Sequence, residues 1–201
     1  MTATMDESLL KAGFDNQVLG SQACFRAALQ ALSRPGHVVP IDVALEGPAP
    51  LGAATTALCL CLLDTDTRVW LDPLADTPAV RSYLRFHCGC PLVREPHAAR
   101  FAVVTDPSAC PSLDAFDIGD EQYPDQSATV ICQLAALTGG EEVILSGPGV
   151  NGETAVTPRG LSEDFAAQWA ANRALFPQGV DMFFTANDQI MGLPRSIDWR
   201  A

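Results

Sequence analysis

The stretch FAVVT at residues 101–105 is an apolar run that ends in a threonine. A run of this length between polar segments predicts a buried strand. Working outward, residues 68–71 (RVWL) predict a second short strand, which is entered through the polar turn DTDT. Residues 128–135 and 142–145 predict two more strands, and the TGGE turn between them predicts that they form a hairpin.

Four other segments have helical character. Residues 21–33 carry apolar side chains at helical spacing, with Ser21 as the expected N-cap and Pro35-Gly36 beyond the end. Residues 51–63 are apolar on nearly every face, which predicts a buried helix. Residues 78–88 predict a helix with proline in its first turn, and residues 162–176 one that is capped by Ser162. The apolar positions of the first helix are Cys24, Phe25, Ala28, Leu29 and Leu32.

The remaining segments complete a single domain over residues 1–201, of which residues 1–15 are expected to be a frayed N-terminus. Residues 37–43 are extended, and Pro40 indicates an edge strand. Residues 180–186 and 189–193 predict a hairpin around Asn187-Asp188, and residues 106–126 predict a surface loop with one helical turn at 113–116. Strands that alternate with helices, plus two hairpins, predict an α/β fold with three α/β/α layers and a mixed sheet.

The composition excludes several classes of partner. Twelve basic and twenty-four acidic residues give a net charge of −12, which disfavours nucleic acid and anionic membrane surfaces. The N-terminus has no secretory signal pattern, so a cytoplasmic location is expected. The seven cysteines are odd in number and the chain is long enough to fold unaided, which predicts reduced thiols rather than disulfides or a metal site.

The basic residues also limit the chemistry. Lys11 is the only lysine, and it lies in a poorly patterned segment, so a lysine Schiff base with pyridoxal phosphate is not expected. The sequence has no P-loop and no G-x-S-x-G elbow, and its three histidines are too dispersed for a metal motif. Asp64 and Asp66 could bind a divalent cation, although a solvated turn is the favoured interpretation.

The most suggestive local group is LRFHCGCPLV at residues 84–93. Arg85 and His87 lie two residues apart near the end of the predicted third helix, where they could hold a phosphate or a partner carboxylate. The alternative is structural: His87 caps the last helical carbonyls and Arg85 forms an ion pair. Local physics favours the structural alternative and identifies no self-sufficient catalytic motif.

Taken together, several blocks resemble the PhnH family of the bacterial carbon–phosphorus lyase system, over about residues 13–195. No block is diagnostic alone, but their order and spacing are specific. The blocks are QACFRAALQALSRPG (22–36), LLDTDTRVWL (62–71), LRFHCGCPLV (84–93), YPDQSATVI (123–131), LSGPGV (145–150), FPQGVD (176–181) and LPRS (193–196). Leu32 and Cys88 depart from residues that are common in the family. Family-motif positions with an expected structural role are Gln22, Phe25, Pro35, Gly36, Asp64, Gly147, Gly149, Pro177, Asp181 and Pro194.

The resemblance implies a fold similar to the large domain of pyridoxal-phosphate-dependent transferases, without the pyridoxal phosphate site and without a metal. It implies association with PhnG, PhnI and PhnJ subunits, and a homodimer when the chain is alone. The implied reaction of the complex transfers an alkylphosphonate to ribose C1 of ATP and releases adenine.

Two roles for this chain within such a complex remain open. The first is structural assembly without independent catalysis, and the second is a contribution of anion-binding residues to the nucleotide or phosphonate site. A stand-alone enzyme ranks last, because no nucleophile–base signature is present. If the four candidate basic residues converge on one pocket, anion binding is favoured; if they are dispersed over the surface, assembly is favoured. The residues that decide between the two roles are Arg26, Arg85, His87 and Arg195.

Overall fold

The core of the protein is a seven-stranded mixed sheet. The computed structural model describes residues 11–42 and 44–200. The strand order is β1-β9-β8-β5-β4-β2-β3, and the five strands from β8 to β3 are parallel, while β9 runs antiparallel to β8 and to β1. The strand bounds are β1 Val39–Pro40, β2 Val69–Leu71, β3 Leu92–Val93, β4 Phe101–Val104, β5 Thr129–Gln133, β8 Asp181–Ala186 and β9 Gln189–Leu193. The predicted buried strands, the edge position of Pro40 and the β8–β9 hairpin are confirmed.

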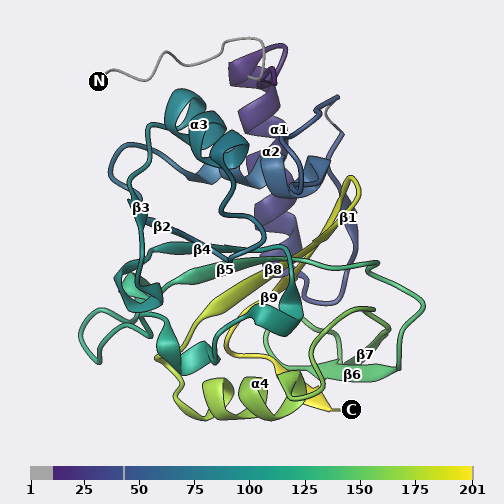
Figure 1. Cartoon of the computed structure of the whole chain (residues 1–201). Helices are drawn as coiled ribbons and strands as arrows, with labels where there is room; N and C mark the ends of the chain where they lie inside the picture. Colours follow the sequence, from purple (N-terminus) through teal and green to yellow (C-terminus); the bar gives the residue numbers. More distant parts are fainter. Residues whose placement is uncertain (1–10, 43, 201) are drawn as a thin grey trace.

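Three helices cover one face of this sheet (Figure 1). They are α1 (Gln17–Ser33), α2 (Ala53–Leu62) and α3 (Pro78–His87). The predicted buried helix is confirmed, since six of the ten residues of α2 are buried. Alternate strand residues, among them Val103, Ile131 and Phe183, point toward these helices and form the first hydrophobic core.

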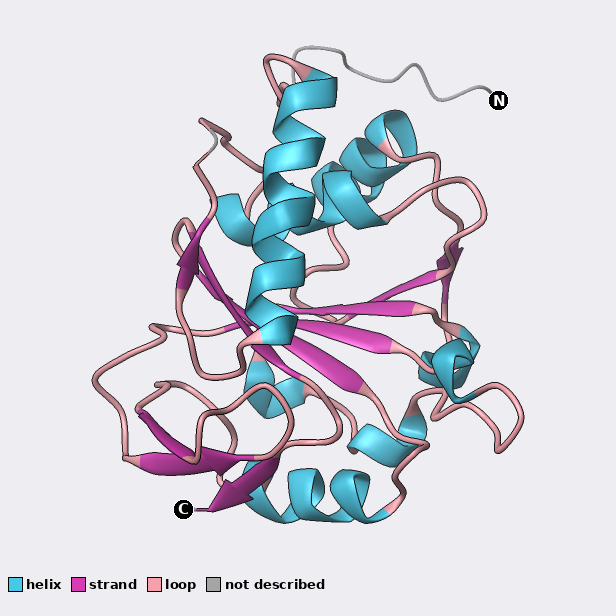
Figure 2. Ribbon diagram, turned by 180° about the vertical axis from the view of Figure 1, so that it is seen from behind, coloured by secondary structure: helices cyan, strands magenta, loops and turns pink. Residues whose placement is uncertain are grey.

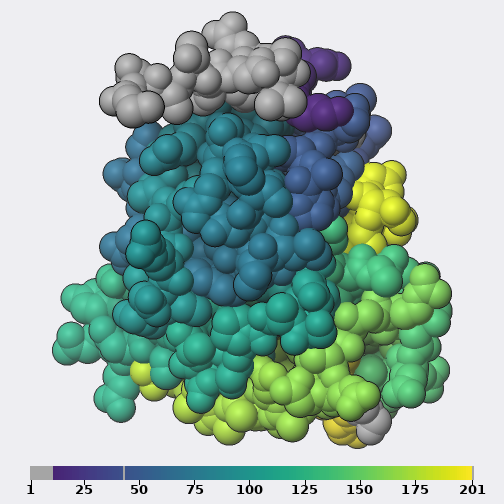
Figure 3. Space-filling view, viewed as in Figure 1, coloured from purple at the N-terminus to yellow at the C-terminus, as the bar shows by residue number. Residues whose placement is uncertain are grey.

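The opposite face is covered by a layer of mixed type. It contains α4 (Phe165–Ala174) and a three-stranded antiparallel sheet of order β10-β6-β7, in which β6 is Val143–Ser146, β7 is Glu153–Val156 and β10 is Asp198–Arg200. Ala102, Val130 and Phe184 point into this second core. The space-filling view shows the two layers as blue and teal above and green below (Figure 3). The α/β class and the mixed sheet are therefore confirmed, but the third layer is half sheet.

Three predictions from the sequence are wrong. Residues 128–135 and 142–145 form no hairpin, because β5 is buried between parallel neighbours and β6 belongs to the small sheet. The last helix begins at Phe165 rather than at Ser162, and Asp164 occupies its cap position without a capping bond to a backbone N–H, its side chain accepting from Gln168 instead. The loop at residues 106–126 contains three helical turns rather than one. Strands β3, β7 and β10 were not predicted from the sequence, because their residues (LV, ETAV and DWR) form no apolar run like the FAVV of β4.

The first helix differs most from expectation. It begins at Gln17, four residues before Ser21, because the Asn16 side chain accepts a hydrogen bond from the Leu19 backbone N–H at 3.0 Å. Its buried side chains are small, whereas Phe25 and Leu29 face solvent. A Cβ added at Gly192 in β9 would come within 2.6 Å of the Ala31 backbone. So close an approach of helix to sheet leaves no room for large side chains between them. The buried residues of α1 are Cys24, Ala27, Ala28 and Ala31.

The segment before α1 packs against α3. The Tyr83 hydroxyl donates to the Ala12 carbonyl at 3.0 Å, and the His87 ring lies 3.1 Å from the Lys11 carbonyl oxygen. The expectation of a frayed N-terminus at residues 1–15 therefore fails for residues 11–15, while residues 1–10 lie outside the described residues.

Candidate functional site

Arg195, one of the four candidates for anion binding or subunit contact, is fully engaged with the protein. Its side chain is 13% exposed, and Nε donates to Asp181 at 3.1 Å. One terminal nitrogen donates to the Pro124 carbonyl at 2.8 Å, and the other to the Ser127 hydroxyl at 2.6 Å and to Asp181 at 2.5 Å. With its donors satisfied and its charge neutralised, Arg195 holds three loops together at the start of β8 and has no hydrogen-bonding capacity left for a phosphate.

The other three candidates do not join it. Arg26 is exposed on α1, and Arg85 is exposed on α3 with no ion-pair partner among the described residues. His87 packs on Tyr83 with ring centroids 4.3 Å apart and holds the Lys11 carbonyl. Neither alternative for the 84–93 block is confirmed: His87 anchors the N-terminal segment rather than the helix end, and Arg85 is unpaired.

Most of the other motif positions form turns or close packing. A Cβ at Gly149 (φ +86°) would come within 2.6 Å of the Ser33 carbonyl and 2.9 Å of Pro35. The turn after α1 thereby contacts the turn between β6 and β7, so two family blocks meet there. Asp64 accepts bonds from the Asp66 N–H and the Thr67 hydroxyl, as a solvated turn does, and the Thr67 bond lowers its pKa. Further motif positions lie as follows: Gln22 exposed on α1, Gly36 and Gly147 at positive φ, Pro177 in a cis bond, and Pro194 after β9.

The position where parallel α/β sheets usually bind ligands is closed by the side chain of Asp72. The chain leaves β2 through α3 on one face and leaves β4 toward the other face, so the carboxyl ends of β2 and β4 form the switch-point crevice. Asp72 follows β2 and is fully buried. It accepts hydrogen bonds from the backbone N–H groups of Ala75 (2.7 Å), Thr105 (3.0 Å) and Asp106 (2.8 Å). The carboxylate thus occupies the crevice itself and closes the loops over it.

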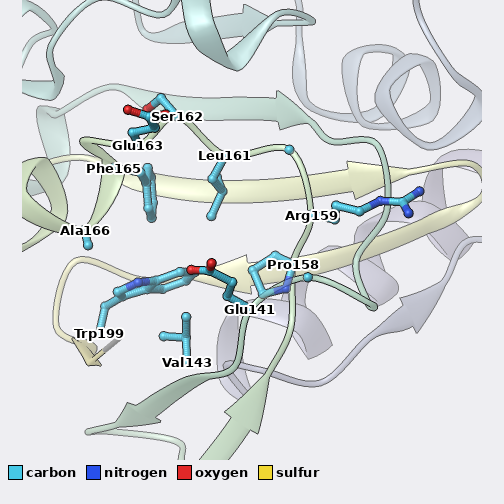
Figure 4. Close-up of a pocket in the computed structure, with 12 residues that line it drawn as sticks. Glu141, Val143, Pro158, Arg159, Leu161, Ser162, Glu163, Phe165, Ala166 and Trp199 are labelled. Carbon is cyan, nitrogen blue, oxygen red and sulfur yellow. The ribbon is translucent and has the colours of Figure 1, made fainter.

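An open cleft lies instead in the second layer, and we call it the Trp199 cleft. It has a volume of about 400 Å³ and is bounded by the start of α4, the loop before it, β6 and β10 (Figure 4). Its lining is mainly apolar, and Trp199 forms one wall. The other apolar lining side chains include Val143, Pro158, Leu161 and Phe165. The complete lining is Gly140, Glu141, Val143, Pro158, Arg159, Gly160, Leu161, Ser162, Glu163, Phe165, Ala166 and Trp199.

The charged groups of the Trp199 cleft have no ion-pair partner among the described residues. Within the described part of the chain, neither Glu141 nor Glu163 makes a side-chain hydrogen bond or an ion pair. The guanidinium of Arg159, the one basic side chain of the lining, points away from the other lining residues in Figure 4. The cleft therefore carries a net negative formal charge, which disfavours phosphates and phosphonates there.

Two thiols lie beneath the Trp199 cleft. Cys110 and Cys132 line a small internal cavity of about 20 Å³ that shares Leu161, Ser162 and Phe165 with the cleft. Burial raises the pKa of Cys110 to about 12 and holds the pKa of Cys132 well above its usual value, so both thiols are neutral at physiological pH. Across residues 11–42 and 44–200, no three His, Cys, Asp or Glu side chains are grouped as metal ligands.

The residues that shape the switch-point crevice and the Trp199 cleft were not among those predicted from the sequence. Asp72 follows a predicted strand directly, and an acidic residue at a strand's carboxyl end was the available signal. Trp199 lies in a three-residue strand, and Glu141 lies in the turn that was assigned to a hairpin. Their proximity arises from the small sheet, which no local pattern indicated.

The protein is a mixed α/β domain. Its switch-point crevice is closed by Asp72, and its candidate anion-binding Arg195 is neutralised by Asp181. The chain belongs to the PhnH family of bacterial phosphonate metabolism proteins, whose family model matches residues 12–200.

Two curated proteins are similar to it over most of their length. A ribose 1-methylphosphonate 5-triphosphate synthase subunit PhnH of Rhizobium meliloti is 36% identical over 193 residues, which cover 96% of both chains. A putative C-P lyase subunit, HtxG, of Stutzerimonas stutzeri is 27% identical over 176 residues, which cover 87% of this chain and 83% of that protein. None of the described helices is both long and apolar enough to cross a membrane.

Proposed function

We propose that this chain is an assembly subunit of a ribose 1-methylphosphonate 5-triphosphate synthase in organic phosphonate catabolism. The 36% identity to a subunit of that name, along almost the full length of both chains, supports the assignment. The complex would transfer an alkylphosphonate to ribose C1 of ATP and release adenine, with counterparts of PhnG, PhnI and PhnJ as the partner subunits. The chain itself would act in the cytoplasm and supply contacts rather than reacting groups.

The observation that carries the assembly role is the outward face of α1. This helix buries alanines and a cysteine and exposes its large apolar side chains. Val18, Phe25 and Leu29 are 76%, 49% and 53% exposed, and with Gln22 they form one stripe at helical spacing. Figure 2 shows α1 along the outer surface with no other element in front of it. We call this set the α1 stripe.

The charge of α1 favours association. The helix contains no acidic residue in a chain of net charge −12, so a second copy or a partner can approach the α1 stripe without carboxylate repulsion. A contiguous apolar surface of this kind marks an interaction site in soluble proteins. The α1 stripe would therefore mediate the homodimer of the isolated chain or its contact with a partner subunit.

The alternative role, a contribution to anion binding, has weaker support. Arg195 is consumed by Asp181, Arg26 lies on α1, and Arg85 and His87 lie on α3, where the His87 ring is engaged by the Lys11 carbonyl. Dispersed cations do not form a phosphate site. We further propose that the likeness to the large domain of pyridoxal-phosphate-dependent transferases extends to the backbone only. Lys11, paired with Glu46 at 2.5 Å on the surface, would form no aldimine.

The test uses two leucines of equal exposure. Leu29 on the α1 stripe is 53% exposed, and Leu74 in the loop after β2 is 52% exposed. Leu29→Glu is expected to make the isolated chain monomeric in sedimentation or to abolish its co-purification with the partner subunits, with unchanged thermal unfolding. Leu74→Glu is expected to do neither. Normal assembly of Leu29→Glu in both assays would refute the assembly role of α1.

A further inference from the structure

We propose that the Trp199 cleft is a binding site for an organic cation, a guanidinium or alkylammonium group. This inference does not depend on the assembly role, because it concerns another face of the molecule. The observations behind it are an aromatic corner, two carboxylates without partners in the described chain, and neighbouring arginines that are paired with other groups or point away from the cleft.

The aromatic corner is formed by Trp199 and Phe165. Their ring centroids are 5.1 Å apart and the planes meet at 74°, an edge-to-face contact in which the buried Phe165 fixes the half-buried Trp199 ring that forms the wall of the cleft. Phe184 supports both rings from behind, at 5.6 Å from Phe165 and 6.2 Å from Trp199. The negative face of an aromatic ring attracts cations, and tryptophan is the strongest such group. The corner therefore offers a preformed surface on which a flat or compact cation can rest.

The carboxylates define the charge of the ligand. Glu141 and Glu163 line the cleft from two sides, one from the turn before β6 and the other from the turn before α4. Neither is paired within the described chain, as shown above. An anionic ligand would meet two like charges, whereas a cation could donate a charge-assisted hydrogen bond to either carboxylate.

The neighbouring arginines do not neutralise these carboxylates. Arg200, next to Trp199, pairs with Glu153 on β7, and Arg173 on α4 pairs with Asp198 at an N···O distance of 3.2 Å. Arg159 lines the cleft but directs its guanidinium outward. Two of the three arginines near the cleft are thus paired with other carboxylates, and the third points away from Glu141 and Glu163.

The volume of the cleft suits an aromatic amidine or an arginine side chain with adjoining backbone. Small-molecule sites commonly range from about 300 to 1,000 Å³, and this cleft has about 400 Å³. Two sources share the chemistry: a free organic cation, and an arginine or lysine side chain presented by another polypeptide.

Benzamidine is a suitable probe because it is flat, aromatic and cationic, and benzamide is its neutral counterpart. The readout is the indole N–H resonance of Trp199 in a nitrogen-15 correlation spectrum, assigned by its loss in Trp199→Phe. Benzamidine is expected to shift this resonance saturably, whereas benzamide should not. The resonance of Trp70, which is buried away from the cleft lining, should stay in place.

The matched variants are Glu141→Gln and Glu142→Gln, since Glu142 is exposed beside Glu141 but does not line the cleft. Glu141→Gln is expected to raise the benzamidine Kd at least about tenfold, the loss of one charge-assisted hydrogen bond. Glu142→Gln should leave the Kd unchanged. Glu163→Gln gives a second, independent loss, and all three variants should unfold at the wild-type temperature.

Three results would overturn the proposal: no saturable shift of the Trp199 resonance, equal binding of benzamide, or equal effects of Glu141→Gln and Glu142→Gln. A capped Gly-Arg-Gly peptide separates the two sources in a parallel titration. Tighter binding of the peptide than of benzamidine assigns the cleft to a polypeptide side chain, and the reverse assigns it to a free cation.

Discussion

The closed switch point between β2 and β4 and the open Trp199 cleft are two places of opposite character. The crevice lies where α/β sheets usually bind ligands, yet Asp72 fills it with a carboxylate that accepts three backbone N–H bonds. The Trp199 cleft lies in the added small-sheet layer, and its carboxylates have no partners among the described residues. The comparison shows that the same chemical group holds loops together where it is buried with satisfied hydrogen bonds, and stays open to solvent where it lines the cleft.

The largest expected effect comes from opening the crevice. Asp72→Ala leaves the N–H groups of Ala75, Thr105 and Asp106 without their acceptor, and each unsatisfied buried donor is costly. We expect the free energy of unfolding in urea to fall by about 3 kcal/mol or more. Asp66→Ala, in an exposed turn, should change it by less than about 0.5 kcal/mol. Equal stability of the two variants would show that Asp72 does not close the crevice.

A second test compares two arginines that the sequence placed in one group. Arg195→Ala removes the partner of Asp181, which is 25% exposed, and releases three loops. Leaving such a carboxylate unpaired should cost about 3 kcal/mol of unfolding free energy. Arg85→Ala, on the exposed side of α3, should cost less than about 0.5 kcal/mol. A large loss of stability in Arg85→Ala with none in Arg195→Ala would reverse their assigned roles.

The smallest expected effect is on the pH dependence of the free energy of unfolding. It concerns Cys110, which lies between the switch point and the Trp199 cleft. Its thiol has a pKa of about 12 in the folded chain, against an ordinary value of 9.0. Burial is the larger cause, and the nearby negative charge of Asp72 is the second. The folded state therefore favours the neutral thiol, and this stability is present below pH 9 and lost as pH rises toward 12. Between about pH 8 and pH 10, the stability advantage of wild type over Cys110→Ala should shrink by about 1.4 kcal/mol. Chemical denaturation at the two pH values measures this, and a constant difference would contradict the burial of the thiol.

The fold was largely predictable because its central elements carry strong local signals. The apolar run at Phe101–Val104, the all-apolar helix Ala53–Leu62 and the Asn187-Asp188 turn each have one favourable structure. Asn187 adopts the positive φ of 52° that such a hairpin turn requires. The small sheet was not predictable, because two of its three strands have too few residues to show alternation and their partners are distant in sequence.

The candidate site was predictable only in its residue types. Arginine and histidine can bind anions, but whether they do depends on their neighbours. Arg195 and Asp181 are fourteen residues apart in sequence and form a buried pair only when the β8–β9 hairpin closes. Asp72 and Thr105 meet across two parallel strands. Such pairings are long-range, and no periodicity of the chain encodes them.

The sequence by itself determined the α/β class, the order of the main strands and helices, the single surface lysine and the acidic net charge. These properties follow from local side-chain patterns and from composition, which do not depend on packing. Tertiary structure decided which carboxylates are satisfied, which arginines are consumed and which face of α1 stays exposed. The close contact of Ala31 with Gly192 illustrates the reason. The distance between helix and sheet, rather than hydrophobicity, determined that the alanines are inside and that Phe25 and Leu29 are outside.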